Sequence, residues 1–446
     1  MSATARSSRS WQKRTVQAAA LVVVFGLVMA ATRLAPDSRG LVGTVAGLGL
    51  LLLAGTLTSE LTEIAGLPHL SGYLLAGFVS GPNVLALIDH DTIDRLGSVN
   101  TLAIALIALA GGAELRVEIL RSALRSLGTA TVLQHSVVTV AGTFAFVLIA
   151  RRGPFEHLGL SAIWGVALLW GVVSASRSPA ALLGVLSELR PAGPLTTFSV
   201  AFVMFSDLVV VILLAIVSAF VRPLLDASYG LSFDDLRIVG HEMLGSVALG
   251  VTLGIALSIY LRLVDRSRLL VLLVLGFGLS ELLRYIQFDA LLSFLVAGFF
   301  VRNFSEQGPK LVQSIQRTGA VVFVIFFALA GAHVDLAILK LVGPIALALS
   351  AIRFVVTVGV ARASSRIARD TDAVRRWGWS PMISQAGLTL GMGVVVARTF
   401  PAFGEAFQAL TVACVTINEI VGPILFKLGL DRAGESGMGT GEAAEH

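Results

Sequence analysis

The stretch FSVAFVMFSDLVVVILLAIVSAF, residues 198–220, carries a single charged side chain, that of Asp207. A helix of about 20 apolar residues is long enough to cross the hydrocarbon core of a bilayer. A carboxylate at mid-depth is costly to keep ionised, so it persists where it faces a wet cavity or binds a proton or a cation. The stretch therefore predicts a membrane helix with a functional aspartate.

Composition extends this prediction to the whole chain. The 446 residues are 56% hydrophobic and 14% charged, whereas a soluble domain has about 25% charged residues. Because irregular backbone cannot face lipid, the recurring apolar runs predict an all-α polytopic membrane protein with thirteen or fourteen transmembrane helices. These helices are predicted at 16–34, 43–64, 70–88, 97–114, 127–150, 159–186, 197–221, 241–261, 268–285, 288–304, 316–334, 341–361, 380–398 and 407–426.

The basic residues predict the orientation. With the N-terminus inside, 21 of the 33 Lys and Arg residues lie in inner segments and 10 in outer segments. This bias predicts both termini in the cytoplasm and a location in the inner (plasma) membrane. It also accounts for the net charge of +5 without a nucleic-acid partner. The basic residues before the first apolar run would also suit a signal peptide, but we interpret that run as a retained helix.

An internal repeat is indicated by two segments. Residues 60–78 and 281–299 each begin with Glu-Leu and end with Leu-x-Ala-Gly-Phe, at a constant offset of 221. Chance similarity of two apolar stretches is the alternative. A duplication with one linker helix would place the two units in opposite orientations, as in many secondary transporters. It predicts an N-terminus with an extra first helix at 1–42, a first six-helix repeat at 43–222, a loop and linker helix at 223–267, a second six-helix repeat at 268–426 and a cytoplasmic tail at 427–446.

Two broken helices are predicted, each the fifth helix of its unit. The first break contains Ser174, Ser176, Arg177, Ser178 and Pro179, and the second contains Pro381, Ser384, Gln385, Gly387, Gly391 and Gly393. Proline cannot continue the backbone hydrogen-bond ladder, and serine can bind the freed groups or an ion. Crossing breaks would direct half-helix ends and free carbonyls at the midplane, where a small ion can bind. Packing by Ser, Gly and Pro is the alternative.

The buried charges give the candidate site. Asp207 can hold a metal cation when ionised or a proton when neutral, but not both at once. Arg177 either pairs with Asp207 or anchors only the half-helix ends. Arg353 is the other deep cation, while Asn418 and Glu419 form a polar pair in the last helix, serving either as a site or as support.

Other functions are not supported by a motif. His135 is interpreted as a packing residue, and the group at His90, Asp91 and Asp94 as part of a solvated outer loop. The single Cys414 rules out a disulfide framework. We find no motif for a phosphate loop, a nucleophile or a metalloenzyme, and so expect neither an enzyme nor a cofactor, and no metal ion beyond Na⁺ or K⁺.

Three motifs carry a family resemblance: GLPHLSGYLLAGFVSGP at 66–82, GGAEL at 111–115 and FFALAGAHVDL at 326–336. Together they resemble the monovalent cation:proton antiporter superfamily, most closely its second branch with Kef-type and related sodium/proton exchangers. The resemblance implies a homodimer, with a scaffold and a moving core that contains two crossed broken helices. It also implies that Asp207 binds the ion, and Ser206 stands beside it where the family has Asp, Asn or Gln.

The resulting expectation is a secondary transporter that exchanges Na⁺ or K⁺ for H⁺ by alternating access in the lipid bilayer. Asp207, Ser206, Ser174 and Ser176 are the candidate ion-binding residues. One acid, rather than the two adjacent acids of some relatives, implies one-for-one, electroneutral exchange. The alternatives are an uncoupled cation pathway on the same scaffold, or a non-transporting membrane sensor with Asp207 locked to Arg177.

Overall fold

The structure is a computed structural model that describes residues 41–64, 67–114, 117, 124–150, 155, 156, 158–225, 234–263, 278, 282, 283, 285, 288, 290–333 and 336–437. The regular structure of these residues is helical throughout, which confirms the predicted all-α fold class. The longer elements are α2 (Leu41–Ile64), α3 (His69–Ser80), α5 (Gly97–Glu114), α7 (Leu124–Ala150), α8 (Leu160–Ser174), α9 (Pro179–Leu189), α10 (Pro194–Leu225), α11 (Asp234–Leu263), α13 (Ala290–Phe304), α14 (Gly308–Ala332), α15 (Leu336–Ala368), α17 (Gly387–Thr399) and α18 (Gly404–Ala433). The short elements are α4 (His90–Arg95), α16 (Asp372–Trp377) and the 3₁₀ helix η1 (Ser380–Met382).

Seven helical spans among the described residues are long and apolar enough to cross a membrane. They are Thr44–Ile64, Leu124–Ile149, Leu160–Leu189, Pro194–Ser218, Met243–Leu263, Val342–Ala368 and Gly404–Ala433. The helix predicted at 16–34 and most of the one predicted at 268–285 lie outside the described residues. Several helices exceed their predicted bounds, because their polar ends continue the backbone ladder beyond the apolar run.

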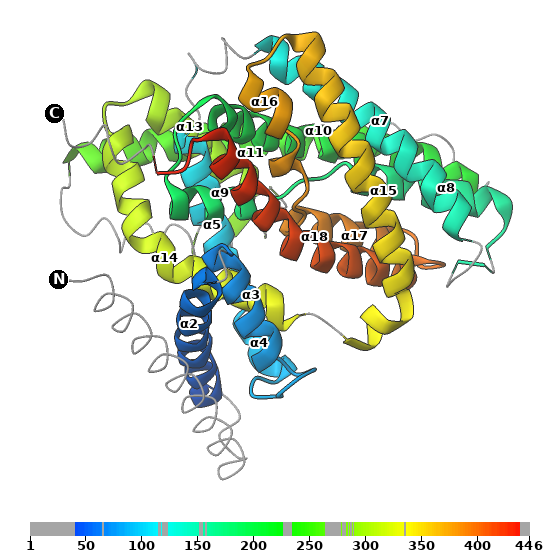
Figure 1. Cartoon of the computed structure of the whole chain (residues 1–446), viewed down its shortest axis with the longest axis horizontal. Coiled ribbons are helices and arrows are strands. Elements are labelled where there is room, and N and C mark those ends of the chain that lie inside the picture. Colours follow the sequence, from blue (N-terminus) through cyan, green and yellow to red (C-terminus); the bar gives the residue numbers. More distant parts are fainter. Residues whose placement is uncertain are drawn as a thin grey trace, which may run out of the picture. The chain divides into compact units, whose positions relative to one another are not determined.

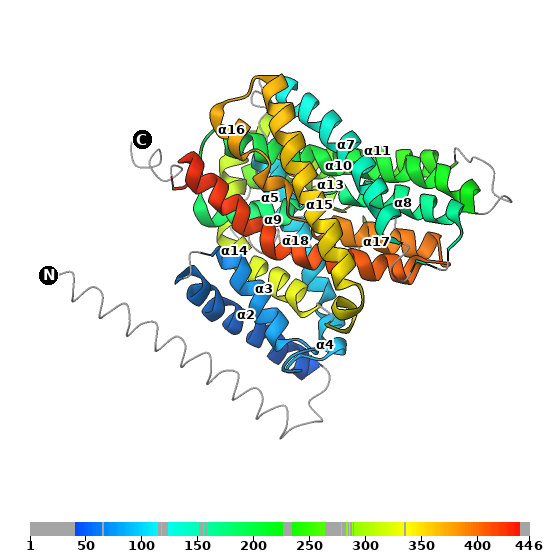
Figure 2. The ribbon, with the colours of Figure 1, turned by 45° about the vertical axis from the view of Figure 1, so that its right-hand side comes forward.

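The chain forms two compact units. The first comprises residues 1–103 and 318–336. In it α2 packs along α3, as Figures 1 and 2 show. Its core contains Leu51, Ala54, Ala76, Ala328 and Leu329, most of them small enough to let helices approach closely.

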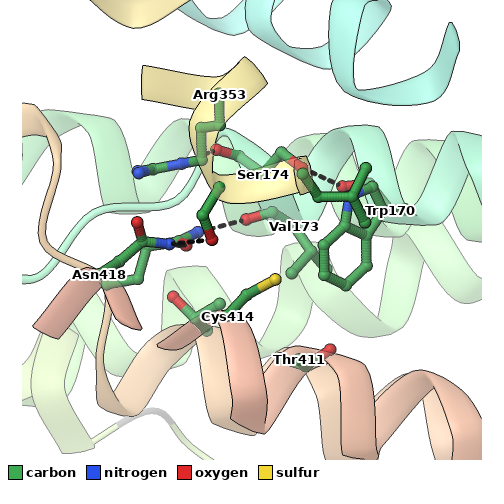
Figure 3. A pocket seen from close by; sticks show the side chains of 11 residues that line it. Trp170, Val173, Ser174, Arg353, Thr411, Cys414 and Asn418 are labelled. Atoms are coloured by element: carbon green, nitrogen blue, oxygen red, sulfur yellow. Dashed lines mark hydrogen bonds between the residues drawn. The ribbon is translucent and has the colours of Figure 1, made fainter. Parts of the chain in front are cut away.

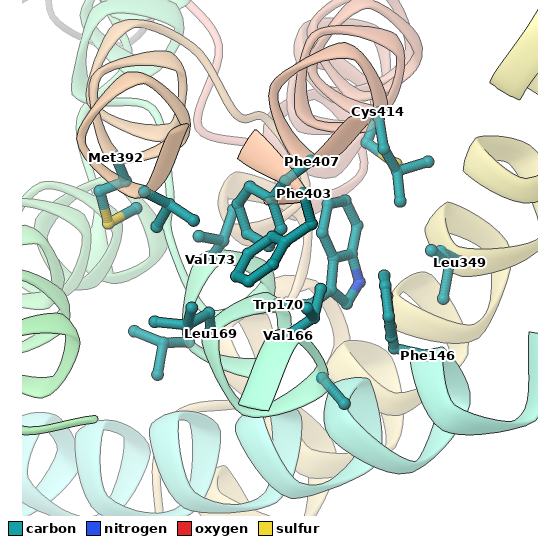
Figure 4. Close-up of a cluster of buried hydrophobic side chains, with 14 of the residues drawn as sticks. Phe146, Val166, Leu169, Trp170, Val173, Leu349, Met392, Phe403, Phe407 and Cys414 are labelled. Atoms are coloured by element: carbon teal, nitrogen blue, oxygen red, sulfur yellow. The ribbon is translucent and has the colours of Figure 1, made fainter. Parts of the chain in front are cut away.

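The second unit comprises residues 104–317 and 337–446 and contains both broken helices. Its core is centred on Trp170 of α8, whose ring lies 5.9 Å from Phe146 and 5.7 Å from Phe407 (Figure 4). Aromatic pairs at this separation add stabilisation beyond the area they bury. This cluster joins α7, α8 and α18 around one end of the first broken helix.

Glycines allow very close helix contacts in both units. In the first unit, a Cβ on Gly77 of α3 would lie 1.7 Å from the carbonyl oxygen of Ala328 in α14. In the same pair of helices, a Cβ on Gly331 would lie 2.0 Å from the oxygen of Leu74. Only glycine fits at both points, since the obstacle is backbone.

The second unit contains a corresponding pair, α13 and α5. A Cβ on Gly298 would lie 2.1 Å from the oxygen of Leu109, and one on Gly112 would lie 1.9 Å from the oxygen of Leu295. Gly77 and Gly298 are the matched glycines of the two Ala-Gly-Phe segments. Each of them packs against the backbone of a neighbouring helix. That neighbouring helix in turn packs a glycine, Gly331 or Gly112, against the backbone of the first helix.

Replacing Gly298 with alanine should destabilise the protein by about 1–3 kcal/mol, because the added methyl group meets rigid backbone. Gly359 of α15 is the matched control, since a Cβ there meets nothing within 4 Å. Gly359→Ala should be neutral or stabilise the helix by up to about 1 kcal/mol. Thermal unfolding of both variants in detergent checks this, and equal Tm values would contradict the close-contact interpretation.

The end of the described chain caps the helix that carries Asp207. The buried carboxylate of Glu435 accepts hydrogen bonds from the backbone N–H groups of Leu195 and Thr196, at 2.7 and 2.8 Å, and from the Thr196 hydroxyl at 2.7 Å. It therefore satisfies two of the free amides at the start of α10 and places a negative charge at the positive end of the helix dipole.

Glu435→Ala should lower the stability by about 2 kcal/mol or more, because hydrogen bonds to a charged group contribute more than neutral ones. The exposed Glu405 in the first turn of α18 provides a control of the same residue type. We expect a clearly lower Tm for Glu435→Ala and a Tm close to wild type for Glu405→Ala. Similar Tm values for the two variants would show that this cap is dispensable.

Candidate functional site: two broken helices that meet

The first predicted break is confirmed. Helix α8 ends at Ser174 and α9 begins at Pro179. The Ser178 hydroxyl accepts a hydrogen bond from the Ala181 amide at 3.1 Å, so it is the N-cap of α9. Proline at the first helical position loses no hydrogen bond, since that amide would have no partner within the helix. Local sequence is therefore enough to stop one half-helix and start the next.

The second predicted break is also confirmed. The short helix η1 is followed by Ile383 and then by non-helical residues up to Ala386, whose φ and ψ are −153° and −132°. Helix α17 then starts at Gly387. Gly391 and Gly393 lie within α17 and do not interrupt it.

Side chains connect the two breaks directly. The hydroxyl groups of Ser176 and Thr389 are 2.7 Å apart. The Gln385 amide nitrogen donates to the Ser176 hydroxyl and to the Val173 carbonyl, both at 3.0 Å. The Ser174 hydroxyl instead donates to Trp170 in its own helix at 2.8 Å. The two interrupted segments therefore meet around Ser176, although they are far apart in the sequence.

Arg353 of α15 binds both breaks at once. Its Nε donates to the Ser174 carbonyl at 2.7 Å, and its Nη2 donates to the Ser176 carbonyl at 3.0 Å. On the other break, Nη1 donates to Ile383 at 2.8 Å and Nη2 to Met382 at 3.0 Å. Figure 3 shows this side chain beside Ser174.

These four contacts change one expectation from the sequence. We expect free carbonyls at the breaks to hold an ion, but a guanidinium group binds those of Ser174, Ser176, Met382 and Ile383. The C-terminal ends of α8 and η1 carry partial negative charge, and Arg353 supplies the compensating positive charge.

Arg177 is a second internal cation, with a fully buried side chain. It donates to the Ser176 carbonyl at 2.8 Å, to the Ser174 carbonyl at 3.5 Å and to the Gln134 side chain at 3.3 Å. It therefore anchors the first break, as one of the two interpretations from the sequence requires. Its charge also interacts with that of Asp207, so the two groups lie within electrostatic range.

Asp207 and Ser206 lie in α10 and are both buried, with Asp207 only 5% exposed. The Ser206 hydroxyl lies 3.0 Å from Nε2 of His135, whose Nδ1 lies 2.8 Å from the Thr131 carbonyl. Since a carbonyl only accepts, Nδ1 carries the hydrogen, and Nε2 of the neutral ring accepts from Ser206. His135 is thus satisfied, as expected for a packing residue, but it also orients the neighbour of Asp207.

The polar pair of the last helix divides into two roles. Asn418 donates to the Gln385 carbonyl oxygen at 2.8 Å, which links α18 to the second break. Ser384 lies against Gly422 of α18. A Cβ on Gly422 would be 2.1 Å from the Ser384 hydroxyl. Glu419 is buried, and its Oε1 accepts no hydrogen bond from the residues that the structure describes. Such an oxygen can bind a proton, a water molecule or a cation.

A small cavity adjoins the meeting point of the breaks. Its volume is about 10 Å³, close to the minimum for one water molecule. Its lining includes Ser174, Arg353, Gln385, Thr411 and Asn418, several of them labelled in Figure 3. Arg353 is part of this lining and Asp207 is not, so the cavity lies beside Arg353. The described residues contain no cluster of three His, Cys, Asp or Glu side chains with metal-binding geometry.

Comparison with known proteins agrees with this fold. The model of the family "Sodium/hydrogen exchanger, transmembrane" matches residues 48–429, so the chain belongs to that family of integral membrane transporters. Two solved structures of the sodium proton antiporter MjNhaP1 from Methanocaldococcus jannaschii share the fold. One, determined at pH 8, has a TM-score of 0.63 at 17% identity and covers 90% of this chain and 99% of that one. The other, an electron-microscopy structure, has a TM-score of 0.65 at 17% identity and covers 92% and 99%.

One further relative matches over a shorter part of the chain. "Na(+)/H(+) antiporter 1" of the same organism is 22% identical over 143 residues, which are 32% of each chain. The matched segment thus spans about a third of that relative. Family membership confirms the resemblance to cation:proton antiporters at the level of the superfamily.

Proposed function

We propose that this protein exchanges a monovalent cation, Na⁺ or K⁺, for H⁺, with Asp207 as the shared binding group. The observation that carries the proposal is a buried carboxylate on α10 in a unit where arginine already binds the carbonyls of both breaks. A cation that enters this unit finds Arg353 at the carbonyls, so a buried acid is the ligand left for it, and Asp207 is the acid that has the Ser206 oxygen beside it. Membership in an exchanger family supports the same assignment.

Competition follows from the chemistry of one carboxylate. The ionised form attracts a cation, whereas the protonated form is neutral and binds one poorly. The Ser206 oxygen supplies a second ligand, because its hydrogen points to His135 in the neutral-ring arrangement. With one acid, one proton replaces one monovalent cation, and the exchange is electroneutral.

Transport requires Asp207 to face each side in turn. We propose that the crossed breaks, stapled by Arg353 and Gln385, move with α10 as one body during alternating access. The proposed organisation is two inverted six-helix repeats, which the matched contacts of Gly77 and Gly298 support. A homodimer with both termini in the cytoplasm completes the proposal.

The proposal is tested by reconstituting the protein in liposomes that contain a pH-sensitive dye. A jump in external Na⁺ or K⁺ should move protons outward from the lumen, at a rate that a membrane potential does not change. A cation current without proton movement would instead indicate an uncoupled pathway. Absence of both fluxes from folded protein would favour a non-transporting sensor, and either outcome overturns the proposal.

A further inference from the structure

A basic cleft lies at the junction of α15 and α16, away from the two breaks. Its volume is about 570 Å³. Its lining residues, which we call the arginine cleft, are Arg362, Arg366, Asp372, Arg375, Arg376 and Trp377. Neither the family resemblance nor the proposed exchange mechanism uses these side chains.

One face of α15 carries exposed apolar residues and, further along the helix, two arginines of this cleft. Val355, Gly359, Arg362 and Arg366 follow one another at spacings of four, three and four residues, so they share one side of the helix. Val355 is 67% exposed, and Arg362 and Arg366 are exposed as well. An apolar exposed stretch belongs against acyl chains, and the two arginines come about 10–16 Å further along the axis. The membrane helix predicted at 341–361 ends just before Arg362, so both arginines lie beyond the predicted span.

The cleft carries excess positive charge. Asp372 is its only acid, and it forms an ion pair with Arg375. The hydrogen bond from Arg375 lowers the pKa of Asp372, so this carboxylate is ionised at neutral pH. Four arginines and one ionised aspartate leave three positive charges. Guanidinium groups match phosphate oxygens in a two-pronged arrangement, which ammonium groups cannot reproduce.

The aromatic residues beside the cleft are held in place. The Trp379 indole donates to the Arg376 carbonyl at 2.8 Å, and its ring lies 6.0 Å from that of Trp377. Trp379 also packs edge-on against Phe354 of α15 at 5.6 Å. Tryptophan is enriched where apolar and polar regions of a bilayer meet. These contacts hold the segment that follows α16 against α15, beside the cleft.

We propose that the arginine cleft binds the phosphate headgroup of an anionic phospholipid. The orientation proposed above places it at the cytoplasmic surface, where anionic lipids attract basic residues. Its shape admits a headgroup while Val355 and its neighbours contact the acyl chains. A bound lipid would hold α16, which leads directly through Gly378 and Trp379 into η1 and the second break.

The test measures binding rather than transport, so its outcome is independent of the proposed exchange. The purified full-length protein in a neutral detergent is titrated with phosphatidylglycerol, with phosphatidylcholine or with inorganic phosphate, and Tm is followed. Phosphatidylglycerol should raise Tm by several degrees in a saturable way, because a ligand that binds the folded state stabilises it. Phosphatidylcholine should not, and added salt should weaken the effect.

The variant with Arg362→Gln, Arg366→Gln, Arg375→Gln and Arg376→Gln should need at least about tenfold more phosphatidylglycerol, since each arginine contributes to headgroup attraction. Lys427→Gln with Arg432→Gln removes two charges from α18 outside the cleft and serves as the control. If the fourfold variant does not fold, the exposed pair Arg362→Gln and Arg366→Gln should still show a weaker response.

Two results would overturn the proposal. The first is an unchanged lipid response in the folded cleft variant. The second is an equal response to inorganic phosphate at the same concentration, which would assign the cleft to a soluble phosphate ligand.

Discussion

Asp207→Asn is expected to reduce cation-driven proton movement in liposomes by at least about 100-fold, because loss of a charged ligand from a buried site removes several kcal/mol of binding. Asparagine has nearly the same shape, so the packing around this buried position in α10 should persist. It cannot lose a proton to become an anion, so neither partner of the exchange retains its binding group. The fluorescence of a dye trapped in the liposomes measures the rate.

Asp94→Asn is the matched control for this experiment. Asp94 is exposed on the short helix α4, so its variant should exchange ions at the wild-type rate. Ser206→Ala should retain exchange with a weaker apparent affinity for the cation, since it loses one neutral oxygen. Unchanged flux in Asp207→Asn, with normal folding, would show that another group carries the ion, and Glu419 would then be the next residue to replace.

Arg353→Met is expected to destabilise the protein by about 3–5 kcal/mol, because removing one partner of a buried charged network leaves the other partners unsatisfied. The Met382 and Ile383 carbonyls would lose this donor altogether, and those of Ser174 and Ser176 would keep only Arg177. Arg353→Lys should lie between methionine and wild type, since an ammonium group keeps the charge but not the planar fork. Thermal unfolding in detergent, without added lipid, measures the Tm values of wild type, Arg353→Lys and Arg353→Met, which should fall in that order.

Arg366→Met is the control, because it makes the same substitution at an exposed arginine of the same helix. Its Tm should stay close to wild type, whereas that of Arg353→Met should fall well below it. An equal Tm for the two variants would mean that the breaks keep their structure without Arg353. That result would contradict the proposal that Arg353 holds the two breaks together as one moving body.

Two interpretations of Arg177 are open in the sequence, and its hydrogen bonds agree with the one in which it anchors the half-helix ends. Its hydrogen bonds to Ser174 and Ser176 make it an anchor of the first break. Its electrostatic interaction with Asp207 keeps a positive charge near the proposed ion site.

Local features of the sequence were enough to predict the class of fold. The apolar length of segments such as 198–220 requires membrane helices, because no other backbone arrangement satisfies its own hydrogen bonds in lipid. Ser178 and Pro179 mark a helix start by themselves, since the cap and its proline act within one turn. The polar residues of the second segment likewise predicted an interruption between η1 and α17. Each of these predictions depends on residues within a few positions of one another.

The partners of the buried polar groups came only from the tertiary structure. Arg353 stood out as a lone cation in an apolar helix, but its acceptor at Ser174 is 179 positions away. Thr389 and Gln134 gave little signal, as single polar residues in membrane helices are common. Glu435 lies in the predicted tail, and the amides that it caps are about 240 positions earlier.

The physical reason is the range of the forces involved. Helix formation, capping and burial in lipid depend on neighbouring residues, so they can be read along the chain. Which guanidinium satisfies which carbonyl depends on how packed helices bring distant backbone together, and a polar group in lipid accepts any donor that packing places within reach. The sequence by itself thus determined the membrane helices, their two interruptions and the presence of a buried acid. Only the folded arrangement decided that the carbonyls at the interrupted ends accept hydrogen bonds from Arg353.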